Sequence, residues 1–456
     1  MKQYKYIFIL LVLCSMVLAG CNKFLDIKPK GKTLLSTVTD YDQWLNDPAL
    51  TQGFGPPFGT FNYLGDNVDV TSITTPPTLP GELLYTWGLQ FSVDLGISPL
   101  FWGEHYAKIN QFNTVVNGID AATGGTEIQK RSLKAEALLG RALEYFYLVN
   151  EYGKPYDSTT VSRDLAVPFV TSNDVTQKVP PRSTIAEVYQ HIIGDIKTAI
   201  PDLPLDNTTN RFRGSTASAY SMLARIYFYA RNYTDARKNA ELALANSKAV
   251  MIDFNGTLPA SNLTSIMPDV IYGRYVIGNS TPTLDFMRSF DANDLRVKKL
   301  YTSIEGYKFI TRGATSFVPT NITAVLANVN TGTSVQEMKL IIAECAARAN
   351  DLTVALQQLD EVRKNRYATA SYVRYQSTVR ENVLLEVLRE RSHELPYNGL
   401  RWFDMRRLDQ ENRMGTVNRY DAQGNIIATL PPHSNRYTLQ IPVQVLSFNP
   451  GMQQNP

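Results

Sequence analysis

Two segments of the chain match each other without gaps, and few folds accommodate such an internal repeat. The segment LARIYFYARNYTDARKNAELAL begins at 223, and IAECAARANDLTVALQQLDEVR begins 119 residues later at 342. Each indicates a helix, a short polar turn and a second helix that is rich in small residues. Alanine or threonine recurs at four aligned positions, namely Ala224/Ala343, Ala230/Ala349, Thr234/Thr353 and Ala236/Ala355.

This pattern is typical of tetratricopeptide-like helical pairs. Alanines stand where two helices must approach closely, and bulkier apolar residues face the next pair. We therefore predict a mainly α protein in which about four helical pairs, discontinuous in sequence, form one right-handed scaffold. Further helices are expected near Val38–Leu45, within 99–119, over 127–152 and after an N-cap at Ser183.

Two stretches differ in character from this helical framework. Residues 51–99 are rich in proline and glycine, and 250–334 are rich in Asn, Ser, Thr and Pro. Short strand-like pieces occur there, such as DVIYGRYV (269–276) and EGYKFIT (305–311). We expect a single domain over 51–456, with helical pairs at about 100–247 and 335–410 and a loop-rich lobe at about 51–99 and 250–334. Binding sites on rigid scaffolds are commonly built from such loops.

The N-terminus predicts export. Residues 1–20 join Lys2 and Lys5 to an apolar run and a small-residue ending, which is a signal peptide and not a lasting transmembrane helix. The ending LAGC resembles the lipobox of bacterial lipoproteins, in which Cys21 carries the lipid, so 21–50 is expected to be a lipid anchor and tether. Cys345 then remains as the one other cysteine of the mature chain, in an apolar helical stretch, and is predicted to be an inert buried thiol.

Composition and motifs argue against several classes of function. A net charge of +3 is no electrostatic footprint for nucleic acid. The four histidines are scattered, and the chain has no HExxH, GxSxG, Walker A or GxGxxG motif. Asp66 and Asp69 are interpreted as turn and cap residues. No cofactor or metal is predicted, and we expect no enzymatic activity.

The stretch LLEVLRERSHELPYNGLRWFDMRR (384–407) concentrates charge around one tryptophan and looks at first like an active site. His393 has no second His or Cys at metal-ligand spacing. We interpret the charged side chains as ion pairs and caps that lock two helices together. They are Arg389, Arg391, Glu394, Arg401 and Asp404.

Six blocks of the chain, in order and together with the lipobox, resemble the SusD/RagB family of outer-membrane nutrient-binding lipoproteins. They include NKFLDIKPKG, RALEYFYLVNEYGKPY with AVPFV, RSTIAEVYQHIIGDIKTAIPDLP, RGSTASAYSMLARIYFYARNYTDA, LRERSHELPYNGLRWFDMRR and IPVQVLSFNPGMQQNP. One departure is Asn398, since the family usually has an acidic residue before the glycine at this point.

The resemblance implies capture of a glycan, or in some members a peptide, and delivery to a SusC-like TonB-dependent transporter in the outer membrane. It also implies a lipid-anchored, surface-exposed location. Sugar binding needs aromatic platforms and planar polar side chains, so candidate residues should lie in irregular segments. They are Tyr85, Trp87, Gln90, Asp66, Asn67, Tyr272, Arg274 and Tyr275, whereas Trp44, Trp102 and Trp402 are assigned to the core.

An alternative stays open at this point. Helical-repeat scaffolds commonly act as adaptors that hold envelope proteins together and bind no small solute. The loop-rich insertion favours the solute-binding hypothesis, because an adaptor has little use for such a lobe.

Overall fold

The computed structural model describes residues 35–54, 60–70, 73–261, 263–277, 281–301, 310–312, 315–317, 328–421 and 423–456. The expected signal peptide, Cys21 and the first part of the tether lie outside these residues, as does most of EGYKFIT. Within the described residues, no helix is both long and apolar enough to cross a membrane.

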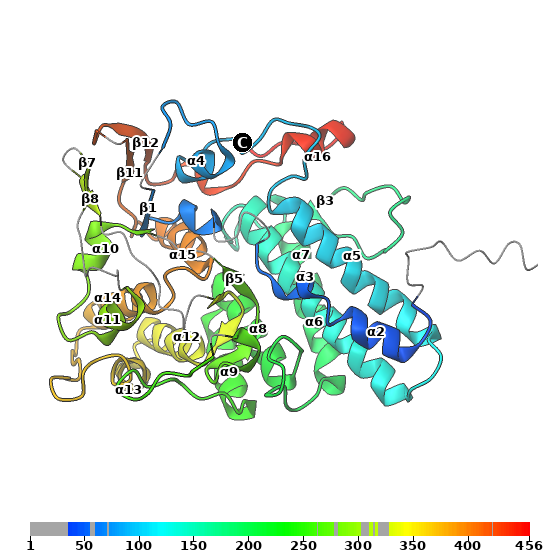
Figure 1. Cartoon of the computed structure of the whole chain (residues 1–456), viewed down its shortest axis with the longest axis horizontal. Coiled ribbons are helices and arrows are strands. Elements are labelled where there is room, and N and C mark those ends of the chain that lie inside the picture. Colours follow the sequence, from blue (N-terminus) through cyan, green and yellow to red (C-terminus); the bar gives the residue numbers. More distant parts are fainter. Residues whose placement is uncertain are drawn as a thin grey trace, which may run out of the picture.

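The fold is mainly α, as the sequence predicts, and consecutive helices pack as antiparallel neighbours (Figure 1). Helices α5, α6 and α7 pack side by side, α8 packs on α9, and α12 packs on α13, α14 and α9. Their bounds are α5 Trp102–Gly118, α6 Glu127–Tyr152, α7 Ile185–Ala199, α8 Thr216–Tyr229, α9 Tyr233–Asn246, α12 Val335–Arg348, α13 Leu352–Arg363, α14 Arg380–Glu394 and α15 Leu400–Asp409. Shorter helices are α2 Val38–Trp44, α3 Pro48–Thr51, α4 Pro80–Tyr85, α10 Leu284–Arg288, α11 Leu295–Leu300 and α16 Val443–Phe448.

The repeat is preserved residue by residue in the structure. Helices α8 and α12 start 119 residues apart, at Thr216 and Val335, each after a serine N-cap whose hydroxyl accepts from a backbone N–H. In both hairpins the turn contains one residue in the left-handed region, Arg231 at φ 57° and Asn350 at φ 62°. Asn232 and Asp351 then cap the second helices, α9 and α13. The two hairpins are therefore the same supersecondary unit.

Helix α7 begins one residue later than predicted. Its N-cap is Thr184 and not Ser183, because the Thr184 hydroxyl accepts from the backbone N–H of Glu187 while the Glu187 carboxylate accepts from Thr184 in return. A reciprocal capping box of this kind needs Glu at the third helical position, and only Thr184 gives Glu187 that spacing.

The strands are short and form two-stranded antiparallel pairs. In the loop-rich lobe β1 pairs with β6, β4 with β10, β5 with β9 and β7 with β8, whereas β11 and β12 form a hairpin after α15. Their bounds are β1 Val68–Asp69, β2 Leu165–Pro168, β3 Arg182–Thr184, β4 Val270–Tyr272, β5 Tyr275–Ile277, β6 Thr281–Pro282, β7 Ile310–Arg312, β8 Thr315–Phe317, β9 Asn328–Asn330, β10 Thr333–Ser334, β11 Val417–Tyr420 and β12 Ile426–Leu430.

The largest hydrophobic core extends over both the helical scaffold and the loop-rich lobe, and four smaller clusters lie beside it. It joins residues from Phe54 to Val445 and includes Trp102 and Trp402, which are 7% and 1% exposed, as predicted. Trp44 is half-buried and packs against a smaller cluster. Cys345 is 3% exposed, and burial raises the pKa of its thiol, so this cysteine is buried as expected.

The charged stretch 384–407 holds two helices, α14 and α15, together through an ion pair, as the sequence predicts. Arg391 of α14 binds Asp404 of α15 at 2.9 Å, and both side chains are buried. Glu394 binds Arg366, and Arg401 binds Asp66. The same stretch therefore also fixes the segments that surround α14 and α15. His393 is 1% exposed and stacks on Phe290 at 4.0 Å. Burial, followed by the nearby arginines, lowers its pKa to about 2, so this imidazole is neutral.

Candidate functional site

The aromatic pair predicted to face a ligand is buried under an arginine. Tyr85 and Trp87 are each 2% exposed, and the Arg419 guanidinium of β11 lies 4.2 Å and 4.3 Å from their ring centres. Arg419 also donates to the carbonyl oxygens of Tyr63, Gly65, Val68 and Tyr85 at 2.7–3.1 Å. The expectation of two exposed platforms is therefore not met, because both rings are packed around a buried cation.

The polar candidates of the first loop hold it to the rest of the fold. Asp66 forms a bidentate pair with Arg401 at 2.6 Å, and Asn67 donates to the Pro396 carbonyl at 2.9 Å. Asp69 accepts from the Tyr85 hydroxyl at 2.5 Å. Asp66 thus lies in a turn, as expected, and also binds the distant Arg401, whereas Asp69 lies in β1 and contacts Tyr85 instead of capping a helix.

Gln90 joins the loop after α4 to the C-terminal segment. Its side chain donates to the Ile441 carbonyl at 3.1 Å and accepts from the Val443 N–H at 3.0 Å. Both functions of the amide are used, so Gln90 is committed to the fold.

The candidates from DVIYGRYV also face inward for the most part. Tyr272 and Arg274 are 2% and 3% exposed, and Arg274 stacks on the Tyr272 ring at 4.4 Å while donating to its hydroxyl at 2.6 Å. Tyr275 is half-buried beside Phe212. Of the eight predicted ligand residues, Asp66, Gln90 and Tyr275 retain partial exposure. Assignment of these eight to ligand binding stays a prediction.

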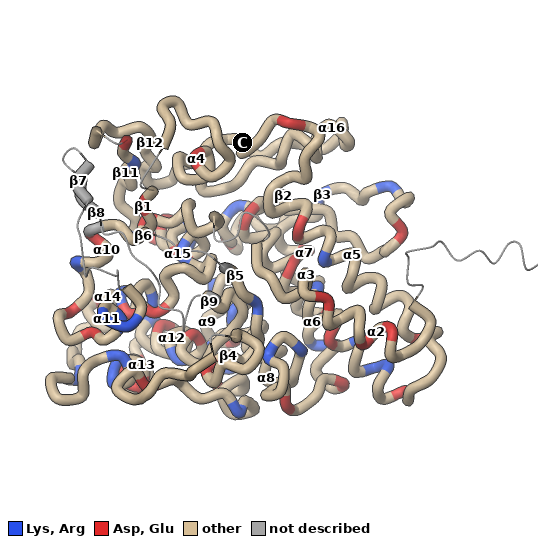
Figure 2. The backbone as a smooth tube through the Cα atoms, in the orientation of Figure 1, with Lys and Arg blue, Asp and Glu red and all other residues tan. Residues whose placement is uncertain are grey.

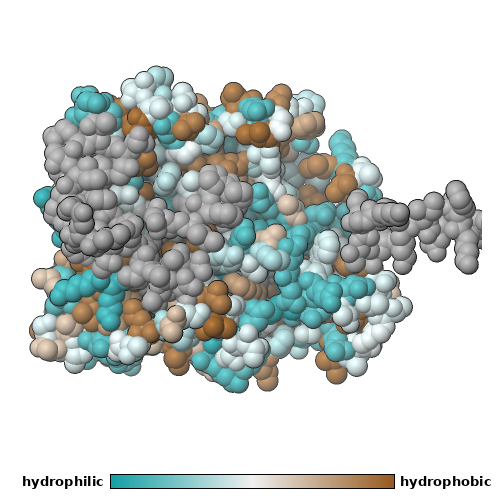
Figure 3. Space-filling model, in the orientation of Figure 1, coloured by the Kyte–Doolittle hydropathy of each residue, from teal (hydrophilic) through white to brown (hydrophobic). Residues whose placement is uncertain are grey.

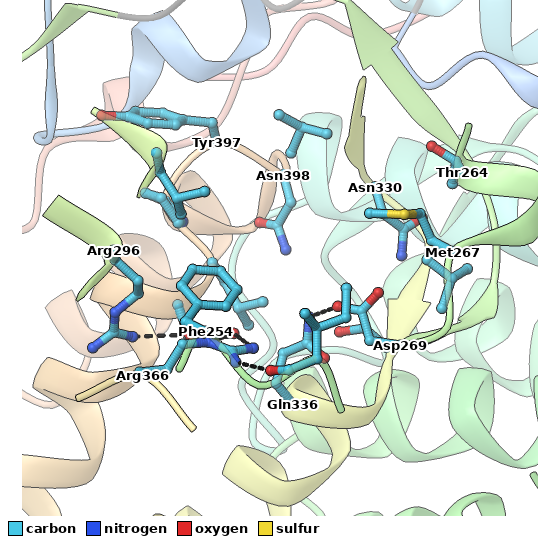
Figure 4. Close-up of a pocket in the computed structure, with 18 of the residues that line it drawn as sticks. Phe254, Thr264, Met267, Asp269, Arg296, Asn330, Gln336, Arg366, Tyr397 and Asn398 are labelled. Carbon is cyan, nitrogen blue, oxygen red and sulfur yellow. Dashed lines mark hydrogen bonds and ion pairs between the residues drawn. The ribbon is translucent and has the colours of Figure 1, made fainter. Parts of the chain in front are cut away.

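A cavity of about 140 Å³ lies between the loop-rich lobe and the helical scaffold (Figure 4). Its lining comes from the α14–α15 turn, the start of α12, α11, Arg366 and the segments before β4 and around β9. One part of the wall is apolar, formed by Ile252, Phe254, Met267, Val270, Leu300 and Val329.

Polar groups converge on the same space. Asp269 accepts from the Gln336 side-chain N–H at 2.8 Å, and burial raises the pKa of the Asp269 carboxyl. The Gln336 carbonyl oxygen and the Thr264 hydroxyl are buried, without a hydrogen-bond partner among the described residues. Asn398 uses its carbonyl oxygen to accept from the Leu400 N–H at 3.1 Å, and its amide nitrogen points into the cavity (Figure 4). The cavity thus offers donors and acceptors beside an apolar surface.

The cations of the cavity wall already have partners. Arg366 binds Glu394 at 2.6 Å, and Arg296 binds Glu394 at 2.9 Å and Asp294 at 2.6 Å. Burial alone would raise the pKa of Glu394, but Arg366 and Arg296 outweigh burial and lower it. Because each guanidinium faces a carboxylate, this wall favours an uncharged guest over an anion.

The sequence carried one signal for this cavity. Asn398 is the position at which the chain departs from the acidic residue that resembling proteins usually have, and the structure places its amide in the wall. The other lining residues, such as Thr264, Asp269 and Gln336, lie in segments far apart in sequence. Among the described residues, no group of three or more His, Cys, Asp or Glu side chains is placed to hold a metal ion.

A scaffold of paired helices with a cavity against an inserted irregular lobe defines a class of helical-repeat binding protein. Two family models match this chain. One is described as "Starch-binding associating with outer membrane" and matches residues 23–228, and the other is described as the SusD family and matches 219–456. The chain therefore belongs to the SusD/RagB family.

Similar proteins agree with this assignment. "SusD-like protein P2" of Formosa agariphila is 25% identical, with 100% of this chain and 99% of that protein covered. A crystal structure of a SusD superfamily protein from Bacteroides thetaiotaomicron has a TM-score of 0.74 and 20% identity, covering 92% of this chain and 100% of that one. A putative sugar binding protein from Bacteroides vulgatus has a TM-score of 0.72, 20% identity and coverage of 93% and 99%. These structures share the fold.

Proposed function

We propose that this protein is a surface-tethered binding subunit that captures an oligosaccharide and delivers it to a TonB-dependent outer-membrane transporter. It binds its cargo noncovalently and transforms nothing. Membership of the SusD/RagB family supports the class of function. The cavity between lobe and scaffold is the observation that carries the choice of a sugar, because it combines an apolar wall with unmatched polar groups.

One sugar ring suits this cavity in size and chemistry. Its volume of about 140 Å³ is that of a site for a single ring rather than for several. The apolar face of the ring would lie on Phe254, and its hydroxyls would donate to the Gln336 oxygen and accept from the Asn398 amide. A peptide is less favoured, because each guanidinium of the described lining already faces a carboxylate and leaves no free cation for the peptide C-terminus. A single ring of a longer chain, such as its end or a branch, is the expected guest.

Calorimetric titration of the purified protein with neutral oligosaccharides, acidic oligosaccharides and peptides tests this proposal. We expect a neutral oligosaccharide to bind. Asn398→Asp should weaken that binding roughly tenfold, about 1.4 kcal/mol, since it replaces a donor by an acceptor. The variant keeps the oxygen that caps α15, so its melting temperature serves as a check on folding.

Asn246→Ala is the matched control, because that exposed amide at the end of α9 is remote from the cavity lining. Equal affinities of wild type and Asn398→Asp would remove the cavity from the proposal. Partner capture without binding of any solute would favour the adaptor instead.

The tether is proposed on the sequence of the N-terminus. Acylation of Cys21 would hold the protein firmly at the outer membrane, since each buried CH₂ contributes about 0.8 kcal/mol and more than one chain is needed for a stable anchor. Mass spectrometry of the native protein should show an acylated N-terminal Cys21. An unacylated, freely secreted product would contradict this location.

A further inference from the structure

The cavity between the lobe and the scaffold has more carboxylates around it than guanidinium groups. Arg296 contacts three carboxylates, those of Asp294, Glu390 and Glu394, at 2.6, 2.7 and 2.9 Å. Arg366 contacts Glu394 as well, at 2.6 Å. Two guanidinium groups therefore share three carboxylates on this side of the cavity. In Figure 2 blue and red segments lie close together around α11 and α14, which carry Arg296, Glu390 and Glu394.

Arg363 does not restore the balance of charge. Its guanidinium reaches Glu390 at 3.8 Å, and Glu386 is its nearer partner. Burial raises the pKa of Glu390, although Arg296 and Arg363 oppose this shift. The described residues around the cavity thus carry a surplus of negative charge.

Asp269 adds a fourth carboxylate, on the side of the cavity away from Arg296 (Figure 4). It accepts from the Gln336 amide nitrogen at 2.8 Å and forms no ion pair within the part of the chain that the structure describes. Burial raises the pKa of the Asp269 carboxyl, and neither the Gln336 hydrogen bond nor the nearby Arg366 charge offsets burial. Hydrophilic residues on the outer surface stand in water (Figure 3), where solvent and salt weaken an ion pair. Beside the apolar wall of the cavity, a cation would stabilise this carboxylate more strongly.

The Gln336 amide supplies a second acceptor next to Asp269. Because an ionised carboxylate accepts and does not donate, the amide nitrogen of Gln336 faces Asp269. The Gln336 carbonyl oxygen is buried and has no hydrogen-bond partner among the described residues. A hydroxyl donates one hydrogen, whereas an ammonium donates three. One ammonium can therefore satisfy both side chains, and its charge is opposite to that of Asp269.

We infer that the captured oligosaccharide contains an amino sugar with a free amine, and that Asp269 and Gln336 hold its ammonium group. This inference rests on the proposed function and names its substrate class. Neutral rings fit the same cavity but bind more weakly, since a hydroxyl brings one donor and no charge. An N-acetylated amine brings one donor, no charge and added bulk. A metal ion is a less suitable occupant, because no three His, Cys, Asp or Glu side chains of the described ranges are placed to hold one.

Calorimetric titration of the purified protein with sets of methyl glycosides tests this inference. Each set contains a hexose, its 2-amino-2-deoxy form and the N-acetylated amine, in the gluco, galacto and manno configurations. In at least one set the amine should bind about tenfold more tightly than both relatives. Asp269→Asn should remove this preference, because asparagine keeps an oxygen that accepts from Gln336 and loses the charge.

Asp94→Asn is the matched control, because it removes the same charge from an exposed residue outside the cavity lining. It should keep the preference of wild type for the amine. Gln336→Met removes the second acceptor and should reduce the preference by a smaller factor than Asp269→Asn. This second variant carries the test if Asp269→Asn does not fold, and melting temperatures check the folding of each variant.

The possible outcomes separate the inference from the proposed function. Equal binding of amine and hexose by wild type would overturn the inference while the proposed function stood. A preference for the amine that survives in Asp269→Asn would contradict the role of this cavity. Binding of Nα-acetyl-lysine amide as tight as that of the amine glycosides would replace the amino sugar by a peptide amine. Failure of every sugar to bind would count against the proposed function itself.

Discussion

Arg419 shows at the scale of single residues why exposed binding aromatics and buried ones are hard to tell apart in a sequence. Tyr85 and Trp87 lie in a Gly- and Pro-rich region, where surface loops are the ordinary expectation. The cation that buries them comes from β11, more than 330 residues further along the chain. Trp87 also donates from its indole N–H to the Leu64 carbonyl at 3.1 Å.

Trp87→Ala should therefore lower stability rather than affinity alone. Loss of a fully buried indole is expected to cost about 3–5 kcal/mol in the free energy of unfolding, measured by urea denaturation. Leu89→Ala, two residues away and 55% exposed, should cost much less. An unchanged free energy of unfolding in Trp87→Ala, together with weakened glycan binding, would restore Trp87 to the ligand site.

A second residue-scale prediction concerns pH. His105 is fully buried between Glu144 at 2.7 Å and Glu151 at 3.1 Å. Burial alone would lower the pKa of His105, but Glu151 and Glu144 outweigh it and raise the pKa from 6.5 to about 9. The folded state therefore holds a proton that the unfolded chain releases. The stabilisation is full below about pH 6.5 and is lost as pH rises through about 9.

The difference between these two pKa values corresponds to about 3 kcal/mol. Urea denaturation of wild type should show stability falling between pH 6.5 and 9, and His105→Gln should lack most of that fall. An identical slope in the variant would show that the imidazolium contributes little.

At the scale of elements, the sequence predicted the helices well because their apolar spacing and caps are local. The 119-residue repeat located both hairpins, and the structure adds that their turns share a left-handed residue. The Ser183 N-cap was wrong by one residue, since Ser and Thr adjoin and the position of Glu187 decides between them. The β11–β12 hairpin was missed, because its strands are joined by the longer loop 421–425 and not by a two-residue turn that a sequence signals clearly.

The turn of the second hairpin gives an element-scale prediction. Asn350 at φ 62° occupies a conformation that glycine and asparagine tolerate and β-branched residues do not. Asn350→Val should cost about 1–2 kcal/mol in the free energy of unfolding, whereas Asn350→Gly should be neutral or slightly stabilising. A Val variant as stable as the Gly variant would mean that the turn relaxes to another conformation.

At the scale of the whole molecule, the lobe and the scaffold share one core from Phe54 to Val445. The cavity forms where the lobe packs against the scaffold, since its lining comes from several separate segments within residues 252–398. No local pattern could bring Thr264, Gln336 and Asn398 together. That is why the fold class and the family could be predicted from the sequence, whereas the cavity could not.

Because the core is continuous, we expect the chain to unfold as one unit. Differential scanning calorimetry of the purified protein should show a single transition whose calorimetric and van't Hoff enthalpies agree. Glycan at saturating concentration should raise the whole transition, since it binds only the folded state. Two separable transitions would instead indicate that lobe and scaffold are independent domains.

The Arg419 side chain donates hydrogen bonds to four backbone carbonyl oxygens, and these contacts do not depend on the side chains of the residues that accept them. A carbonyl is the same whichever side chain accompanies it, so a substitution at the half-buried Tyr63 can change the side chain while the hydrogen bond from Arg419 persists. The amino-acid sequence of this loop can therefore change while its backbone conformation is kept. A likeness of fold at 20% identity, with a TM-score of 0.74, is an outcome that hydrogen bonds to backbone atoms would permit.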